Sequence, residues 1–472
     1  MGRRKPFTIE KVVIEGIADD GKCVAHHDGM AIFVRDVAPG DVADLEVRKV
    51  KRNYLEGRPI HFHQKSAHRV EPICTHFGLC GGCKWQHVSY DIQLEQKSQI
   101  VKDALERIAK VELPELQSII GSDEQYHYRN KLEFTFSNQR WLTIEEINSG
   151  DEMSRNALGF HIPKMFDKIL GIDECFLQGS PSNEIRNAVY KYAAKKKLSF
   201  YDIRRKTGFL RNLIIRTSSL EEVMVILQVA EENEALVPLL DFISDQFTQI
   251  TSLLFVINDK MNETFNDLEI KCHNGREFIW EQMPVYSNSS KNWKFKIGPK
   301  SFFQTNTSQA AKLYKTVFDF ANLSGNEVVY DLYTGTGTIA ICASSQVSQV
   351  IGIEYVEAAI DDARDNSEVN NVTNTQFFAG DIKDILNDDF VSTHGAPHVI
   401  ITDPPRAGMH KYVVQRILEM APDRIVYVSC NPATQARDIV LLDSNYRVTK
   451  VQPVDMFPHT SHVENVVLLV HR

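Results

Sequence analysis

The sequence predicts an α/β protein of three domains, in which a Rossmann-like parallel sheet follows a small β-barrel and a mixed α+β region. Three observations predict this. The chain has 472 residues, too many for one ordinary core. Its first 63 residues alternate short β-rich runs with turn signals. From about residue 300 onward, apolar strand segments alternate with helical ones.

The N-terminal domain is expected over residues 1–66. Its β-rich runs are FTIEKVVIEGIA, GMAIFVRDV and DVADLEVRKVKRNYLEGRPI, separated by Asp28-Gly29 and Pro39-Gly40. Such dipeptides are typical of hairpin turns. Four or five closely spaced strands in so short a stretch predict an OB-like barrel.

A central domain is expected over residues 67–290 and a C-terminal domain over 291–472. The central part holds a cysteine-rich loop, a helical stretch near 90–110 and a mixture of strands and helices. The C-terminal part alternates strands such as VVYDLYTG, VIGIEYV, VIITDPP and RIVYVSCN with helical segments. That alternation predicts parallel strands joined by crossover helices.

Composition narrows the class of protein. No secretory signal begins the chain and no apolar run approaches the length of a membrane span, so we expect a cytoplasmic protein without a membrane partner. The net charge of −9 argues mildly against a nucleic-acid partner. Two groups of basic residues argue the other way: Lys49, Lys51, Arg52 and Arg58, and Lys195, Lys196, Lys197, Arg204, Arg205, Lys206 and Arg211. Either group could equally be a solvated face.

A glycine-rich turn follows the strand VVYDL and precedes a helical segment. It carries Gly335 and Gly337, and Glu354 ends the next strand about 20 residues on, where an acid can accept ribose hydroxyls. The third glycine of a dinucleotide fingerprint is missing, and Asp331 lies inside the motif. The pattern D-x-x-x-G-x-G is typical of S-adenosylmethionine-dependent methyltransferases, whose cationic ligand suits nearby acids. Asp381 lies where an acid often meets the adenine.

Two further strand ends carry reactive side chains. VIITDPPRAG places Asp403 at the end of one strand, and RIVYVSCNPAT places Cys430 at the end of the next. Open α/β sheets bind ligands at the carboxyl ends of their strands. A lone cysteine is usually a small buried hydrophobe, but Cys430 precedes Asn431-Pro432, a turn at the ligand edge.

The motifs DPPRAG, SCNPAT and HVENVV, with SFFQTN upstream, resemble those of the RNA uracil-5-methyltransferase family over nearly the whole chain. The resemblance implies a class I methyltransferase domain that methylates carbon 5 of a uridine in RNA. It implies that Cys430 adds to carbon 6 as nucleophile, that Glu464 is the base, and that Asp403 hydrogen-bonds the uracil. The S-adenosylmethionine residues it implies are Gln304, Asp331, Tyr333, Gly335, Gly337, Glu354, Asp381 and Asp403.

A uridine in folded RNA must be extruded before a thiolate can reach carbon 6. Phe302, Phe303 and Tyr333 are candidates for stacking on or replacing that base, although such residues are more often simply part of a core.

Three cysteines in a glycine-rich loop, Cys74, Cys80 and Cys83, need a fourth partner to bind a metal. The resemblance implies Cys175 as the fourth and a [4Fe–4S] cluster as the ligand, with zinc as the alternative and a structural role for either. Cys23, Cys272 and Cys342 are expected to be ordinary buried thiols. The N-terminal barrel resembles a TRAM domain, an RNA-binding module, with Cys23 where its motif usually has glycine.

Alternatives stay open at this point. A radical methylthiotransferase would need a C-x3-C-x2-C motif, a cytosine-5 methyltransferase has other nucleophile motifs, and a catalytically silent RNA-binding or assembly factor would not need Asp403, Cys430 and Glu464. Because cluster-bearing members of the family mostly act on large-subunit ribosomal RNA, we expect 23S rRNA as substrate. Transfer RNA, and methylation at two rRNA sites, remain alternatives. We expect a monomer.

Overall fold

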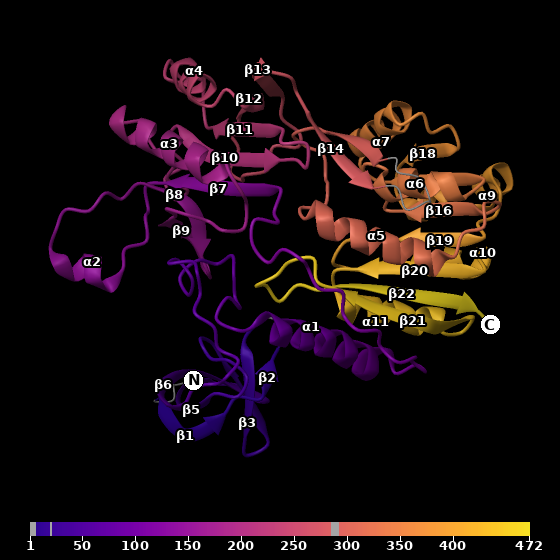
Figure 1. The fold of residues 1–472 in the computed structure, drawn as a ribbon, viewed down its shortest axis with the longest axis horizontal. Coiled ribbons are helices and arrows are strands. Elements are labelled where there is room, and N and C mark those ends of the chain that lie inside the picture. Colours follow the sequence, from indigo (N-terminus) through magenta and orange to yellow (C-terminus); the bar gives the residue numbers. More distant parts are fainter. Residues whose placement is uncertain (1–5, 19–20, 285–291) are drawn as a thin grey trace.

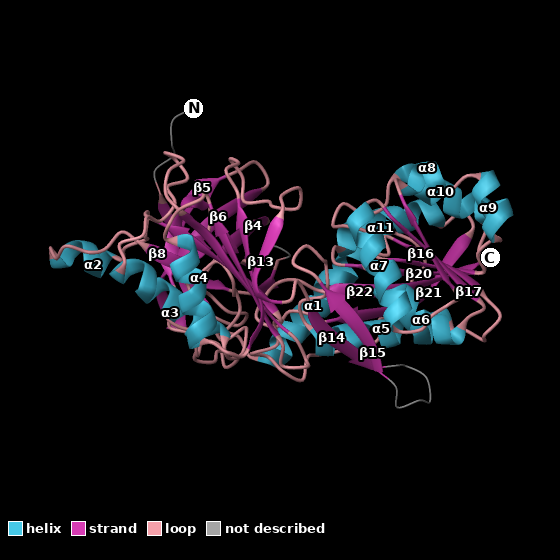
Figure 2. Ribbon diagram, turned by 90° about the horizontal axis from the view of Figure 1, so that it is seen from above, coloured by secondary structure: helices cyan, strands magenta, loops and turns pink. Residues whose placement is uncertain are grey.

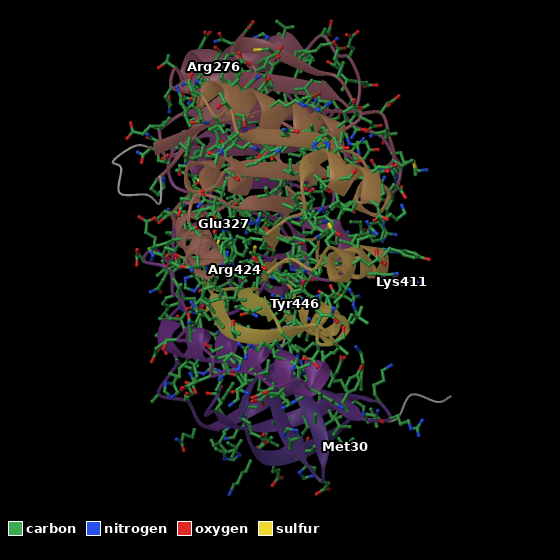
Figure 3. All side chains as sticks on the ribbon, turned by 90° about the vertical axis from the view of Figure 1, so that its right-hand side faces the viewer. Met30, Arg276, Glu327, Lys411, Arg424 and Tyr446 are labelled. Atoms are coloured by element: carbon green, nitrogen blue, oxygen red, sulfur yellow. The ribbon has the colours of Figure 1, made fainter. Side chains whose placement is uncertain are left out.

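The computed structural model describes residues 6–18, 21–284 and 292–472, and three large sheets organise them (Figure 1). The N-terminal sheet lies at one end of the molecule and the sheet of the middle third at the other. In Figure 1 the C-terminal sheet lies to the right, at a height between those of the other two sheets. Figure 3 shows the same order along the molecule, with Met30 at the tip of the N-terminal sheet and Arg276 at the far end.

Six strands form the N-terminal sheet, in the order β1-β5-β6-β4-β3-β2. Asp28 and Gly29 both have positive φ between β3 and β4, as a two-residue type I′ hairpin requires. Trp85, from the segment after the sheet, is buried in its apolar core. The strands are β1 Phe7–Val13, β2 Gly16–Ile17, β3 Cys23–His27, β4 Met30–Val34, β5 Val42–Val50 and β6 Tyr54–Gln64.

The linker that follows contains α1 (Tyr90–Ala104), continued by a π-helical turn (Leu105–Ala109). This helix packs on one face of the C-terminal sheet, together with α10 and α11. In Figure 1 it lies between the N-terminal sheet and the C-terminal one. The predicted helical stretch at 90–110 is therefore present, and it bridges two domains.

The middle of the chain forms a seven-stranded sheet in the order β13-β12-β11-β10-β7-β8-β9. Helices α3 and α4 cover one face, and the other faces the C-terminal domain. Because both faces are covered, every residue of β11 is buried, as its almost wholly apolar run VMVILQV indicates; Gln228 is the one polar residue in it. The elements are β7 Lys131–Ser137, α2 Ile144–Ser149, β8 Ala157–Ile162, β9 Met165–Gly171, α3 Ser182–Lys195, β10 Leu210–Thr217, β11 Val223–Val229, α4 Leu236–Gln246, β12 Ile250–Ile257 and β13 Ile270–Gly275.

The C-terminal sheet has the order β18-β17-β16-β19-β20-β22-β21. The strands from β18 to β20 are parallel. Beside β20, β22 runs antiparallel to them, and the edge strand β21 runs antiparallel to β22. Helices α5, α6 and α7 cover one face, and α10, α11 and α1 the other (Figure 2). This is the predicted Rossmann-like, doubly wound arrangement.

The strands of that sheet are β16 Val328–Leu332, β17 Gln349–Glu354, β18 Thr375–Ala379, β19 Val399–Thr402, β20 Arg424–Ser429, β21 Tyr446–Val454 and β22 Glu464–His471. Its helices are α5 Thr307–Ala321, α6 Thr338–Ala343, α7 Glu357–Val369, α8 Ile382–Ile385, α9 Asp388–His394, α10 Lys411–Met420 and α11 Pro432–Leu442, with a 3-10 turn at Ser344–Gln346.

A two-stranded hairpin of β14 (Ile279–Pro284) and β15 (Asn292–Ile297) packs into the same core as α5, α6 and α7. Its first strand therefore belongs by packing with the C-terminal domain, although it precedes residue 291. In the part of the chain that the structure describes, no helix is long and apolar enough to cross a membrane.

Candidate active site

The three residues expected to act on the substrate meet at the carboxyl ends of the parallel strands of the C-terminal sheet. Asp403 follows β19, Cys430 follows β20, and Glu464 begins β22. Strands β19 and β20 are parallel neighbours, so their carboxyl ends coincide, and β22 runs antiparallel to β20, so its first residue reaches the same edge. Sheet topology therefore brings together residues that lie 61 positions apart in the sequence.

The thiol and the two carboxyl groups lie close enough to influence one another's protonation; Glu464 is buried, and Asp403 and Cys430 are partly buried. Burial, with a smaller contribution from the Glu464 and Asp403 carboxyls, raises the pKa of Cys430 to about 11, while the Arg406 guanidinium opposes the rise. Burial also raises the pKa of Asp403 and of Glu464, and for Glu464 the neighbouring Asp403 adds to the rise. Ionisation of one of these three groups therefore opposes ionisation of the other two.

The turn after β16 has the backbone conformation that a close ligand contact needs. Tyr333, Gly335 and Gly337 all have positive φ. A Cβ on Gly337 would lie 2.9 Å from the Cβ of Ala363 and 3.0 Å from the ring of Phe377, so glycine is required there for space as well as conformation. The predicted order of strand, glycine turn and helix is therefore present.

Asp331 lies beneath that turn and is 1% exposed. Its Oδ2 accepts a hydrogen bond from Thr334 Oγ1 at 2.5 Å, while Oδ1 is buried and has no partner among the described residues. Burial raises the pKa of Asp331 to about 7, and the negative charges of Asp403 and Glu354 add to the rise. A buried, unsatisfied carboxylate oxygen in a negative environment fits a cationic ligand.

Glu354 and Asp381 close the next two strands. Glu354 accepts backbone hydrogen bonds from Gly335 (3.2 Å) and Val356 (3.0 Å), which hold its carboxylate against the turn. Asp381 caps α8, accepts from the backbone of Lys383 at 3.1 Å and pairs with its ammonium. Both acids therefore lie along the same edge as Asp331.

A cleft of about 700 Å³ opens beside these acids. Of the predicted cofactor residues, Tyr333 and Asp381 line it. Tyr355 and Ile382 line it too, and the sequence analysis missed both. Their only sequence signal is position, since each directly follows a predicted acid, Glu354 or Asp381.

The segment with Gln304 lies between β15 and α5, and it hydrogen-bonds both to the central domain and to the turn after β16. The Asn130 side chain donates to the Gln304 carbonyl at 2.9 Å, and Thr336 Oγ1 donates to the Phe302 carbonyl at 3.3 Å. The ring of Phe302 is 68% exposed, whereas Phe303 is buried in the core. Phe303 is therefore excluded as a stacking residue, and Phe302 stays a candidate.

Cys74, Cys80, Cys83 and Cys175 gather where the linker loop meets the central domain. All four are free thiols, and Cys80 and Cys83 pack against the same core that contains Cys175. Burial raises the pKa of each, and Cys74, Cys80 and Cys175 all raise that of Cys83, so the four are electrostatic neighbours. Within the described residues, no group of three or more His, Cys, Asp or Glu side chains is spaced to hold a single metal ion.

The remaining cysteines differ from one another. Cys23 and Cys342 are buried, as expected, and Cys23 donates its S–H to the Val37 carbonyl at 3.0 Å. Cys272 is only half-buried, so its prediction as a buried thiol was wrong. It lies on β13, the edge strand of the central sheet, where packing covers less of each side chain.

Fewer members of the two basic groups are exposed and unpaired than the sequence suggests. In the N-terminal sheet Lys49 pairs with Glu56 and Arg58 pairs with Glu46, both at 2.8 Å. In the central domain Arg211 does not belong to a surface group, because it is 2% exposed and its guanidinium donates to the carbonyls of Asn258, Lys260 and Asn262. Lys51, Arg52, Lys195, Lys196, Lys197, Arg205 and Lys206 are exposed.

Comparison with known proteins agrees with this architecture. Residues 267–472 match the family model described as tRNA (uracil-5-)-methyltransferase, and residues 3–60 match the TRAM domain. An RNA methyltransferase of Bacteroides thetaiotaomicron is 54% identical over 96% of this chain and 99% of its own length. One of Chlorobaculum tepidum is 38% identical over 98% of this chain and 96% of its own length.

Among solved structures, the Pyrococcus abyssi tRNA (uracil-54, C5)-methyltransferase in complex with S-adenosyl-L-homocysteine superposes with a TM-score of 0.74. The two chains are 30% identical, over 98% of this chain and 100% of the other. The doubly wound sheet and its acidic cofactor turn thus define a class I, S-adenosylmethionine-dependent methyltransferase with an N-terminal TRAM domain. Within that class, the chain belongs to the RNA uracil-5-methyltransferase family and is an RNA methyltransferase.

Proposed function

We propose that this enzyme transfers a methyl group to carbon 5 of a specific uridine in RNA through a covalent adduct between Cys430 and carbon 6. The observation that carries the proposal is the convergence of Asp403, Cys430 and Glu464 at one sheet edge, beside the cofactor turn. A silent RNA-binding factor would have no need to bury two carboxyl groups and a thiol together, since their burial costs stability.

S-adenosylmethionine supplies the methyl group from its sulfonium when it is bound. Asp331 and Glu354 at the turn, with Asp381 and Tyr333 in the adjoining cleft, would hold it. The unpartnered oxygen of Asp331 suits its cationic amine. Gly335 and Gly337 would allow the backbone to come close to it. Gln304, by resemblance to the family, would contact the cofactor or the base from the opposite side.

Cys430 begins the reaction on the base. Its thiolate forms a bond to carbon 6, and the electron pair of the 5,6 double bond moves to carbon 5 as an enolate, which then takes the methyl group. The thiol of the partly exposed Cys430 must first lose its proton to solvent, and its raised pKa opposes this. The charge of Arg406 lowers that pKa and so favours the thiolate.

Glu464 completes the reaction. The proton on carbon 5 passes to its carboxylate, the 5,6 double bond re-forms and the carbon 6–sulfur bond breaks, which returns the thiolate. The raised pKa of Glu464 makes it a stronger proton acceptor than an exposed carboxylate. Asp403, also held toward its protonated form by burial, can donate a hydrogen bond to the uracil edge and stabilise the enolate.

We propose that Cys74, Cys80, Cys83 and Cys175 hold a [4Fe–4S] cluster. Four neighbouring free thiols suit it, and the Gly82 N–H donates to Cys80 Sγ at 3.4 Å, as backbone amides do at such clusters. Zinc, which four thiolates also bind, is the alternative ligand. When bound, the cluster would fasten the linker loop to the central domain.

For the substrate we propose 23S rRNA, because the four cysteines are typical of the family branch that mostly modifies large-subunit RNA. Transfer RNA is the second candidate, and the similarity to the Pyrococcus abyssi tRNA enzyme favours it. The exposed cations near the TRAM sheet and on the central domain are suited to phosphates, which both RNAs offer.

The deciding experiment combines RNA mapping with adduct trapping. Cells that lack the protein should lose 5-methyluridine at a 23S rRNA position, and loss from tRNA instead would select the second candidate. With the identified RNA, the variant Glu464→Gln should accumulate a protein–RNA species that survives a denaturing gel. The double variant Glu464→Gln/Cys430→Ala is the matched control, and an adduct that persists in it would refute the assigned nucleophile.

A further inference from the structure

The position of Glu464 depends on the backbone that precedes it. Among the described residues no side chain hydrogen-bonds its carboxylate, which lies in the pocket beside Asp403 and Arg406. Glu464 begins β22, opposite Val454 at the end of β21, and residues 455–463 join the two strands. Contacts that hold residues 455–463 in place therefore also hold the backbone of the proposed base, Glu464, in place.

A buried ion pair holds the start of the connection. Lys97 of α1 donates to Asp455 Oδ1 at 2.5 Å, and the side chains of both are 0% exposed. Tyr90, on the same helix, donates to Asp455 Oδ2 at 2.9 Å. The backbone N–H of Phe457 donates to Asp455 Oδ1 at 3.0 Å, and Lys97 also donates to the Phe457 carbonyl at 3.0 Å.

The same helix and the cysteine loop hold the middle of the connection. Gln93 Oε1 accepts from the His459 N–H at 2.8 Å, and the backbone N–H groups of Lys84 and Trp85 donate to the His459 carbonyl at 2.8 and 3.1 Å. Trp85 also contacts Lys97, whose ammonium lies 5.7 Å from its ring, and its indole N–H donates to the Gly21 carbonyl of the N-terminal sheet at 3.2 Å.

A buried charge pair is a poor way to gain stability. Removing two charges from water costs about as much as their attraction returns, and apolar pairs of similar volume are often as stable. What such a pair does provide is one geometry, because neither charge tolerates the loss of its partner. Here that geometry joins a helix outside the methyltransferase sheet to the segment that ends at the proposed base.

We propose that Lys97 and Asp455 are positioning residues, which place Glu464 to remove the proton from carbon 5 of the methylated base. The inference rests on the proposed function. It assigns to the linker helix a part in the last chemical step and none in the addition of Cys430 or in methyl transfer. Cys430 and Asp403 follow strands that do not touch the ion pair, so their steps keep their geometry.

The test is the double variant Lys97→Met/Asp455→Leu, which removes both charges at similar volume, assayed with RNA tritiated at carbon 5 of uridine. We expect the covalent protein–RNA adduct to accumulate on a denaturing gel while tritium release slows by about a hundredfold, the usual scale for a misplaced catalytic group. Tyr90→Phe, which removes one hydrogen bond from Asp455 and keeps both charges, should show a smaller rise in adduct.

Arg69→Met is the control, because it breaks an ion pair between the partly exposed Arg69 and the buried Asp41 (2.7 Å), and within the described part of the chain neither residue hydrogen-bonds to residues 455–463. It should lower the melting temperature without adduct accumulation. If turnover falls in the ion-pair variants and adduct does not rise in either, the pair is purely structural and the inference is overturned. If Glu464→Gln itself traps no adduct, the proposed function fails instead, so the two failures are distinguishable.

Discussion

Two regions of this molecule hold partly buried thiols with raised pKa values, and we propose a different use for each. Burial raises the pKa of Cys430 and of Cys80 to about 11 in each case. The neighbours differ: Cys430 faces two carboxyl groups and one guanidinium, whereas Cys80 faces Cys74 and Cys175. Burial alone therefore does not decide what a cysteine does. We infer that the groups around it do, and these groups suit the transient reaction proposed at one site and the permanent ligation proposed at the other.

The largest effect should come from removing the reactive thiol. Cys430→Ala should lower methyl transfer by about 10⁴-fold or more, since no other group can add to carbon 6. The melting temperature should change little, and RNA binding in a filter assay should persist. Cys272→Ala, at a half-buried thiol on an edge strand, should keep full activity. If Cys430→Ala still methylated RNA, Cys430 would not be the nucleophile, and the proposed difference between the two thiol regions would be wrong.

The second prediction concerns the four-cysteine region. Cys83→Ser should abolish the brown colour and the iron content of the purified protein, and should lower the free energy of unfolding by about 3 kcal/mol or more, because ligand binding stabilises the folded loop. Methylation should fall less than in Cys430→Ala. Denaturant titration, iron analysis and a methylation assay measure the three effects. Cys23→Ala should retain its iron, and zinc in the parent protein would contradict the cluster.

Sequence patterns predicted the parts of the site that depend on local order. Asp403 and Cys430 each end an apolar strand, and parallel strands place such ends together. The Lys97–Asp455 pair had no such signal, because its members lie 358 positions apart and belong to different motifs. Arg211 was misread for a related reason: the basic residues at 204–206, a few positions earlier, are exposed, while the guanidinium of Arg211 donates to three carbonyls of a distant loop.

A third, smaller effect tests the electrostatics around Cys430. Arg406 lowers the pKa of both Cys430 and Glu464, so Arg406→Gln should raise both. Because the reaction needs both groups deprotonated, kcat/KM at neutral pH should fall by about tenfold and the rising limb of its pH profile should move about one unit toward alkaline pH. Arg416→Gln, whose guanidinium pairs with Asp388 and Glu419, should leave the profile unchanged. An acid shift would contradict the assignment.

The smallest effect is on stability and has the opposite sign to the effect on activity. Burial and Asp403 raise the pKa of Glu464 above that of an unfolded glutamate, so the unfolded chain releases this proton at a lower pH than the folded protein. Stability is therefore lost as pH rises from the unfolded pKa to the folded one. A glutamine does not titrate, so Glu464→Gln should raise the free energy of unfolding near pH 8 by about 1–2 kcal/mol and change it little at pH 4. Denaturant titrations of both proteins at the two pH values measure this difference. An equal change at both pH values would mean that the gain comes from packing and that Glu464 does not carry a strained charge.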